Sequence, residues 1–374
     1  RDLHLCDRRQ RLMCIRDSYN SLMEKNMNYT YNFTAGFCHL MILLLPVIFL
    51  CTGCGKKEAT YFNPDTDPYI RESDRIDFDI STLNAIPDNP NPTLSVPTYI
   101  TKVKDTYFIV DCYHNQVIYN ENLTDPLYEW RIMASGLGMP HTLASDGFVY
   151  LIDDTENNRV LVMEKGVNEN GQSVFLPTQE FTEIGDRPHY IVYDEKTKTF
   201  YVWSSESGEM YLLRRPADDT GLYLTEVRSI PSLNGVYVRS FTIEDDTIYF
   251  VSGNSSIIEA ELDTFKVRKE YPVPDSMSGM VQLTFIRDYC YLTISTDATG
   301  NQEYATMIRA RKLSDLAKGS YEDVYASFVG GGTPYYISRI DDTYYLTEHR
   351  LPGHSIWSFQ VNDKNEITNV TTIY

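Results

Sequence analysis

The stretch from Pro140 to Lys165, PHTLASDGFVYLIDDTENNRVLVMEK, has the order of features expected of a strand, a turn, a strand, a loop and a further strand. Asp146-Gly147 is a turn dipeptide, and FVYLI (148–152) is rich in β-branched and aromatic residues. The polar loop DDTENN follows, and Arg159 leads into the strand VLVM. The stretch therefore predicts three consecutive strands of one small antiparallel sheet.

The same order of elements recurs along the chain, each time around an aromatic-rich second strand. The second strands are YFIV (107–110), VYLI (149–152), FYVW (200–203), IYFV (248–251), CYLTI (290–294) and YYLT (344–347). Equivalent first-strand positions are spaced by 43, 48, 50, 43 and 53 residues, and they are Thr98, His141, His189, Arg239, Gln282 and Tyr335. Four-stranded propeller blades repeat at about this period. The sequence predicts an all-β fold, a six-bladed β-propeller with four-stranded antiparallel blades over residues 75–374.

Two terminal segments compete for the place that closes the ring. Residues 75–80, RIDFDI, alternate polar and apolar side chains and predict a strand. Residues 367–374 predict another. Either segment could supply the outer strand of the sixth blade, which would leave the other as an additional strand.

The tightest motif in the repeats runs from Asp153 to Val162, where an Asp ends the second strand and Asn-Asn-Arg precedes an apolar strand. A partial copy, FIVDCYHNQVIY, stands at 108–119. This order of features resembles the NHL repeat. Propellers of that type include protein-binding scaffolds, gluconolactonase-like hydrolases and a zinc-dependent lyase that acts on peptidyl-hydroxyglycine. The resemblance thus implies a fold and does not choose an activity.

The N-terminal segment is not part of the predicted propeller. Residues 1–22 are interpreted as non-native sequence, because Met13–Ser18 can be back-translated as a transposon end used in sequencing-library preparation. A genuine charged extension is the alternative. Residues 55–74 are polar and are interpreted as a tether.

Residues 23–54 resemble a bacterial lipoprotein signal peptide. The apolar run 37–50 is shorter than the about 20 residues that span a bilayer, and the small Gly53 precedes Cys54. Cys51 stands where this motif usually has Leu. The resemblance implies that Cys54 becomes the lipid-modified first residue, whereas the alternative is an uncleaved anchor helix. Both interpretations place the protein in the bacterial cell envelope, outside the cytoplasmic membrane.

The charge of the chain argues against nucleic acid as a partner. The chain has 33 basic and 52 acidic residues, which gives a formal net charge of −19. A surface this acidic repels a phosphate backbone. The expected partners are therefore a protein, a peptide or a glycan, together with the membrane through the lipid anchor.

Histidines gather on one face of the predicted propeller. The segment that leads into the first strand of a blade and the loop between its second and third strands lie on the same face. The candidate ligand-binding residues at the mouth of the central channel are His141, His189, Arg239, Gln282 and Tyr335. Such a ring suits a polar ligand. The alternative is structural, because water enters propeller channels and polar side chains line them in any case. Residues at such a wet mouth are expected to contribute little packing, and a ligand that needs neutral imidazoles is expected to bind less well between about pH 7 and pH 5.

A divalent metal is the second interpretation of the same face. The candidate ligands are His141, His189, His349 and His354, and histidine nitrogens are common ligands of Zn²⁺. The oxygen-rich run from Asp153 to Asn158 could suggest Ca²⁺, although Asp and Asn in such loops usually cap their own backbone. The sequence has no compact histidine pair such as HxxxH, so a divalent metal, Zn²⁺ or Ca²⁺, is possible but not firmly implied.

Two functions of different classes follow from the sequence. The favoured one is a lipid-anchored extracytoplasmic β-propeller that binds a protein, peptide or glycan through one face. The alternative is a metal-dependent lyase or hydrolase with its site at the mouth of the central channel. The sequence leaves enzymatic activity open and favours a binding protein.

Overall fold

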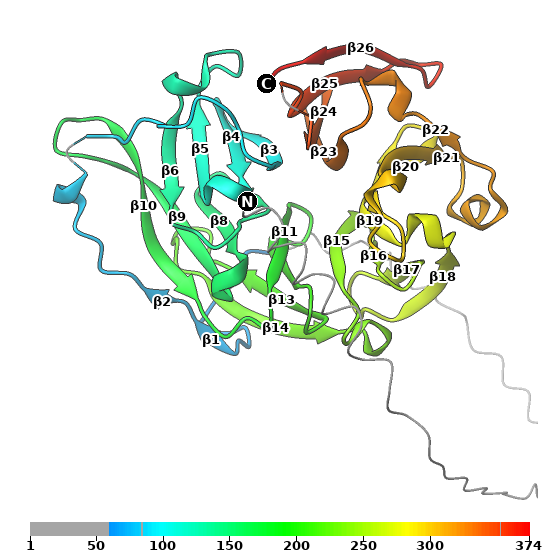
Figure 1. The fold of residues 1–374 in the computed structure, drawn as a ribbon. Helices are drawn as coiled ribbons and strands as arrows, with labels where there is room; N and C mark the ends of the chain where they lie inside the picture. Colours follow the sequence, from blue (N-terminus) through cyan, green and yellow to red (C-terminus); the bar gives the residue numbers. More distant parts are fainter. Residues whose placement is uncertain (1–59, 84, 352) are drawn as a thin grey trace, which may run out of the picture. The chain divides into compact units, whose positions relative to one another are not determined.

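The computed structural model describes residues 60–374 except 84 and 352, and these residues form six antiparallel sheets arranged in a ring (Figure 1). Blade 1 consists of β3 (Pro97–Val103), β4 (Thr106–Asp111), β5 (Gln116–Asn120) and β6 (Arg131–Ser135). Blade 2 consists of β7 (Leu143–Ser145), β8 (Val149–Asp154), β9 (Arg159–Val167) and β10 (Ser173–Phe181). Blade 3 consists of β11 (Pro188–Asp194), β12 (Thr199–Ser204), β13 (Glu209–Arg214) and β14 (Tyr223–Ser229).

The second half of the chain repeats this arrangement. Blade 4 consists of β15 (Val238–Glu244), β16 (Thr247–Ser252), β17 (Ser256–Glu261) and β18 (Val267–Pro272). Blade 5 consists of β19 (Gly279–Ile286), β20 (Tyr289–Thr296), β21 (Thr306–Ala310) and β22 (Glu322–Asp323). Blade 6 consists of β23 (Thr333–Ile340), β24 (Thr343–His349), β25 (Ile356–Val361) and β26 (Ile367–Thr372). The predicted six-bladed fold and all six predicted second strands are confirmed.

Helical structure in the described part of the chain consists of short 3-10 turns in the connections. These are η1 (Ile80–Thr82), η2 (Cys112–His114), η3 (Leu127–Glu129), η4 (Thr155–Asn157), η5 (Pro231–Leu233), η6 (Asp275–Met277), η7 (Gln302–Tyr304), η8 (Leu313–Lys318) and η9 (Tyr325–Ser327). No helix among the described residues is long and apolar enough to cross a membrane.

The segment before blade 1 runs along the outside of the first three blades in reverse order. β1 (Arg71–Glu72) pairs with β14 of blade 3, and β2 (Asp74–Arg75) pairs with β10 of blade 2. Asp88 then bridges to Arg131 in blade 1. We call residues 60–95 the strap. The predicted strand over 75–80 is therefore wrong beyond its first residue, and the strap forms additional outer edges instead of closing the ring.

The strap also contains most of the predicted tether. Phe62 is 2% exposed and packs against Tyr223 of β14, with ring centroids 4.9 Å apart. Residues from 60 onward thus belong to the fold, whereas the remainder of the predicted tether, the signal-like segment and Cys54 lie outside the described residues.

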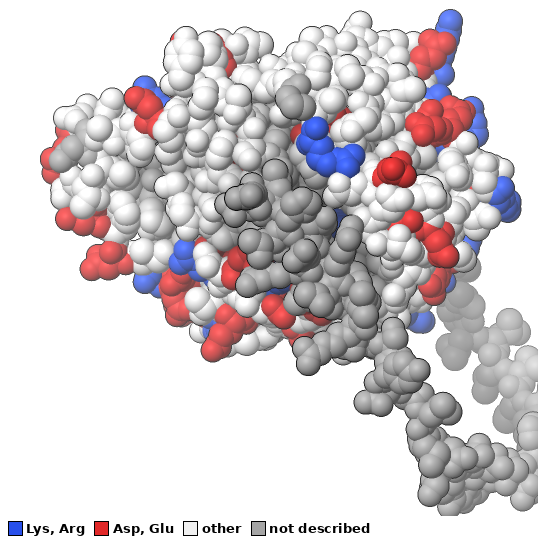
Figure 2. All heavy atoms as spheres, viewed as in Figure 1, with Lys and Arg blue, Asp and Glu red and all other residues white. Residues whose placement is uncertain are grey.

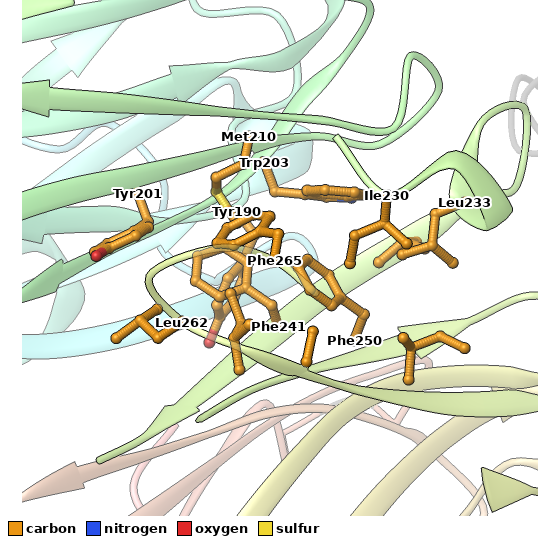
Figure 3. Close-up of a cluster of buried hydrophobic side chains, with 14 of the residues drawn as sticks. Tyr190, Tyr201, Trp203, Met210, Ile230, Leu233, Phe241, Phe250, Leu262 and Phe265 are labelled. Carbon is orange, nitrogen blue, oxygen red and sulfur yellow. The ribbon is translucent and has the colours of Figure 1, made fainter. Parts of the chain in front are cut away.

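The hydrophobic core is divided among the interfaces between neighbouring blades. Within the described residues, six clusters of buried apolar side chains occur, and five of them join two consecutive blades, including the pair formed by blades 6 and 1. The sixth lies between blades 3 and 4 and extends to Val281 of blade 5 and to Tyr335 and Tyr336 of blade 6. Figure 3 shows the cluster between blades 3 and 4, where Trp203, Phe241 and Phe250 meet. Each sheet therefore buries both faces, which explains why its second strand is aromatic and β-branched.

Hydrogen bonds between consecutive blades encircle the central channel. Donor and acceptor come from adjacent blades in every case: Thr98 Oγ1 to His141 O (2.9 Å), Ile191 N to Thr142 Oγ1 (3.0 Å), His189 Nδ1 to Arg239 O (3.0 Å), Ser240 Oγ to Val281 O (2.6 Å), Gln282 Nε2 to Ile337 O (3.3 Å) and Thr347 Oγ1 to Thr98 O (2.7 Å). We call this set the inner ring. It satisfies polar groups that the packed centre would otherwise leave without a partner.

The seam between blades 6 and 1 is closed by the end of the chain. β26 is the outer strand of blade 6, and the phenol of Tyr374 reaches into blade 1. That phenol lies 2.6 Å from the carbonyl oxygens of Leu123 and Asp125, and it accepts a hydrogen bond from Trp130 Nε1 at 2.9 Å. Figure 1 shows the C-terminus beside this seam.

The packing of Phe250 gives a direct test of the blade register. Phe250→Ala should lower the free energy of unfolding by about 3–5 kcal/mol, because the side chain is fully buried between blades 3 and 4. Tyr128→Ala is the matched control, since Tyr128 is 65% exposed, and it should cost less than about 1 kcal/mol. Denaturant titration measures both. A loss for Phe250→Ala as small as that for the control would contradict the register.

Candidate functional site

Five ring side chains form an arc at the mouth of the channel. The ring centroids of Tyr237 and His189 are 5.8 Å apart, those of His189 and His141 3.9 Å, those of His141 and Tyr335 6.2 Å, and those of Tyr335 and His349 5.9 Å. We call these side chains the mouth arc. They come from blades 2, 3, 4 and 6, so residues far apart in the chain meet at one place.

Register shifts in the innermost strands determine the direction in which several of these side chains point. The pairing of β11 with β12 shifts register between Pro188 and Tyr190, on either side of His189. A shift also brackets Arg239 in β15, and another brackets Tyr335 in β23. A β-bulge bends its strand and redirects the side chain of the additional residue. The repeated bulge therefore explains why these positions face the centre of the ring.

His189 is a buried and neutral link between blades 3 and 4. Its side chain is 0% exposed, with Nδ1 3.0 Å from Arg239 O and Nε2 3.2 Å from the Tyr237 hydroxyl. A carbonyl oxygen can only accept, so Nδ1 carries the proton and Nε2 accepts from Tyr237. Burial lowers the pKa of His189 well below its usual value, and the charges nearby lower it further. Both ring nitrogens are therefore used inside the fold.

His141 is held between blades 2 and 3 by a buried polar cluster. Its main-chain N–H donates to Asp153 Oδ2 (2.9 Å), and its Nδ1 lies 3.2 Å from Thr155 Oγ1. Burial lowers the pKa of His141 to about 3, and the positive charges of Arg187 and Arg239 act in the same direction. Burial likewise raises the pKa of Asp153 well above its usual value, against the hydrogen bonds that it accepts from Thr142, His141 and Thr155.

The arginines near the mouth arc differ in their partners. Arg187 forms ion pairs with Glu156 and Glu206. Arg239 stands over the Tyr237 ring, 5.2 Å from its centroid, and makes a 3.4 Å contact from Nη1 to Met280 O. Arg239 forms no ion pair with a carboxylate in the described part of the chain, residues 60–374 without 84 and 352.

Two of the predicted site residues lie away from the mouth arc. Gln282 is 6% exposed, and its amide binds the Tyr190 hydroxyl (3.1 Å) and the main chain of Ile337. His354 stacks on Trp357 in blade 6, with centroids 5.1 Å apart and an interplanar angle of 7°. The structure thus brings together His141, His189, Arg239, Tyr335 and His349.

Two residues of the site had no signal in the repeat pattern. Tyr237 and Arg187 directly precede their first strands, at a position that differs in residue type from blade to blade. Tyr237 lies two residues before Arg239, and Arg187 two residues before His189. Inspection of the residues that flank the first-strand positions would have suggested both.

The candidate metal ligands do not converge on one point. The rings of His141 and His189 are stacked at an interplanar angle of 28°, so their in-plane nitrogen lone pairs run side by side instead of meeting. Among the described residues, no group of three or more His, Cys, Asp or Glu side chains is arranged to hold a metal ion. The donor set as arranged does not fit a tetrahedral zinc site.

Comparison with known proteins supports the fold and no particular activity. No protein-family model matches the chain, and no curated protein matches it in sequence. A putative 6-phosphogluconolactonase from Bacteroides uniformis superposes with a TM-score of 0.52 at 13% identity, over 84% of this chain and 95% of that chain. A second, from Bacteroides fragilis, has a TM-score of 0.51 at 12% identity, over 83% and 95%. A streptogramin B lyase structure has a TM-score of 0.48 at 15% identity, over 76% and 85%.

The six antiparallel sheets define the class of protein, a six-bladed β-propeller. At identities this low, a shared fold does not transfer a substrate or a reaction.

The burial of the histidines corrects two expectations about the mouth. Residues there were expected to be wet and to contribute little packing, but His141 is 7% exposed and His189 is fully buried. A ligand that needs neutral imidazoles was expected to bind less well between pH 7 and pH 5. Burial lowers the pKa of His141 to about 3 and that of His349 to about 4, so both rings stay neutral across that range.

Removal of the His189 ring should destabilise the fold. His189→Ala removes the Nδ1 donor of Arg239 O, which keeps only the 3.2 Å hydrogen bond from the Tyr336 hydroxyl, and it removes the acceptor of the Tyr237 hydroxyl. Loss of a partner by a buried polar group costs about 1–3 kcal/mol. His349→Ala is the control, because no hydrogen bond of its ring is found among the described residues, and it should cost less. Denaturant titration at pH 7 compares the two variants. Equal stability of His189→Ala and wild type would show that the inner ring does not need this imidazole.

The buried histidines should also make stability depend on pH. The folded pKa of His141 is below its unfolded value near 6.5, so its contribution is complete above about pH 6.5 and is lost as the pH falls toward the folded pKa of about 3. The free energy of unfolding should fall by up to about 1.4 kcal/mol per pH unit for each such ring. Titrations between pH 7 and pH 4, with His141→Ala as the reference, isolate this slope. Parallel profiles for wild type and variant would contradict it.

Proposed function

We propose that the protein is a lipid-anchored β-propeller of the bacterial cell envelope, related to NHL-repeat propellers, that binds a protein, peptide or glycan through its mouth face. The observation that carries the proposal is the meeting of the mouth arc with Arg239, a partly exposed cation without a carboxylate partner among the described residues. Aromatic rings and a spare cation supply both contact area and polar recognition.

The anchored location is supported by the sequence before the fold. The strap begins at residue 60, six positions after Cys54. If Cys54 carries the lipid, the intervening chain spans at most about 20 Å, since extended residues advance by about 3.3–3.6 Å each. The propeller would then sit close to the membrane surface.

A metal-dependent lyase or hydrolase remains the alternative function, and the parallel ring planes of His141 and His189 weigh against it. Metal analysis of the purified protein, before and after chelation and reloading, addresses it directly. A stoichiometric divalent metal that returns on reloading would favour the enzyme over the binding protein.

Lipidation at Cys54 can be tested in cells. Replacing Cys54 with Ser should abolish incorporation of labelled fatty acid and release the protein from the membrane fraction, because the thiol is the attachment point. Wild type is the control for both measurements. Labelling of the variant at the wild-type level would overturn the lipoprotein proposal.

Ligand binding at the mouth face can be tested by introducing a larger side chain there. His349→Trp adds volume at the mouth end of β24, and binding to ligands found on peptide and glycan arrays should fall at least about tenfold. The matched control is Asp342→Trp, at the other end of the same strand, where the Asp342 side chain is 97% exposed. Equal binding by both variants would move the site away from the mouth.

A further inference from the structure

Arginine side chains lie near the neutral rings of the mouth arc, although the chain as a whole is acidic. The formal net charge is −19, and Figure 2 shows acidic and basic side chains around the periphery of the face that it draws, with a further basic group nearer the middle and an acidic group beside it. Arg187 and Arg239 are close enough to His141 and His189 to lower the pKa of both rings, and Arg350 and Arg239 do the same to His349. Burial is the larger cause of these lowered pKa values, and the arginines act in the same direction.

The described carboxylates near the arc pair with Arg187 or with buried donors, and none of them pairs with Arg239. Glu156 and Glu206 are engaged by Arg187. Asp153 is 0% exposed and accepts hydrogen bonds from the main chain of His141 and Thr142 and from the hydroxyls of Thr142 and Thr155. Neither set reaches Arg239, whose positive charge is left for a ligand.

The geometry of Arg239 prepares it for a planar anion. Its guanidinium is held over the Tyr237 ring, and the Tyr237 hydroxyl is fixed in turn by His189 Nε2. Its one hydrogen bond among the described residues is the 3.4 Å contact from Nη1 to Met280 O, so most of its five N–H donors are free. A guanidinium positioned in this way donates two parallel hydrogen bonds to a carboxylate.

The imidazoles cannot replace this cation. His189 uses both ring nitrogens inside the fold, and the rings of His141 and His349 stay neutral over the physiological range. These rings contribute apolar faces beside the anion, and the Tyr335 ring continues that surface. The charge of a ligand must then be met by Arg239.

We propose that the mouth binds its ligand through a carboxylate group, with Arg239 as the bidentate donor and the mouth arc as the surface beside it. This assignment rests on the proposed function, because it names the chemical group recognised at the same face. The net negative charge of the chain disfavours anions elsewhere on the protein.

The experiment uses two sugars that differ at one carbon. Galacturonate carries a carboxylate where galactose carries a hydroxymethyl group, and ligand-observed NMR with the full chain in detergent micelles measures the binding of each. We expect galacturonate to bind at least about tenfold more tightly than galactose. Arg239→Met should abolish that preference, and Arg239→Lys, which keeps the charge without the fork, should retain part of it.

A matched control and two competitors complete the test. Arg268→Met removes an arginine from β18 of the same blade, where it pairs with Glu261, and it should leave galacturonate binding unchanged. Acetate should compete with galacturonate, whereas acetamide should not. Competition by inorganic phosphate as strong as that by acetate would overturn the carboxylate assignment in favour of anions in general.

The outcomes separate this inference from the proposed function. If the array ligands lose binding in His349→Trp but bind Arg239→Met normally, the mouth is the binding site and the carboxylate assignment is wrong. If neither change affects binding, the proposed function fails as well. Equal binding of galactose and galacturonate to wild type would also overturn the carboxylate assignment.

Discussion

Each blade depends on a neighbour on both sides, because both faces of every sheet are apolar. The six buried clusters lie between blades, so a single blade has no core of its own. The inner ring adds a polar requirement to this apolar one, since donors such as Thr98 and Ser240 find their acceptors only on the next blade. The ring is therefore stable as a closed whole, as in other repeat folds where most contacts are between neighbouring units.

The blades could be predicted from the sequence because their signal is local. An aromatic triplet flanked by a turn and a polar loop identifies each second strand without knowledge of the rest of the chain, and Phe250 and Trp203 indeed lie in the core. The strap could not be predicted in this way. β1 and β2 have two residues each, and their partners, such as Leu224 and Gln179, lie more than a hundred residues away. Two residues carry no periodicity, so only tertiary pairing defines these strands.

The candidate site was predicted in part, and the reason is chemical. Position in the repeat predicted that His141, His189 and Tyr335 lie together, because equivalent positions of the blades face one centre. Residue type suggested wet, titrating histidines, whereas desolvation and nearby arginines keep these rings neutral. Whether a histidine binds a ligand or links two blades depends on what its two nitrogens contact, as His189 shows. The repeat pattern in the sequence does not show which groups those nitrogens contact.

The strap determines which contacts of the molecule bear a force applied to the chain before residue 60. Because it runs across blades 3, 2 and 1 before the first blade begins, a pull on the chain before residue 60 loads the Phe62 contact with blade 3 and the short β1 pairing first. The seam beside blade 6 lies at the opposite end of the chain and is secured by Tyr374. Tension from an anchor would thus peel a surface strap, one short pairing at a time, while the junction that keeps the ring closed carries no direct load.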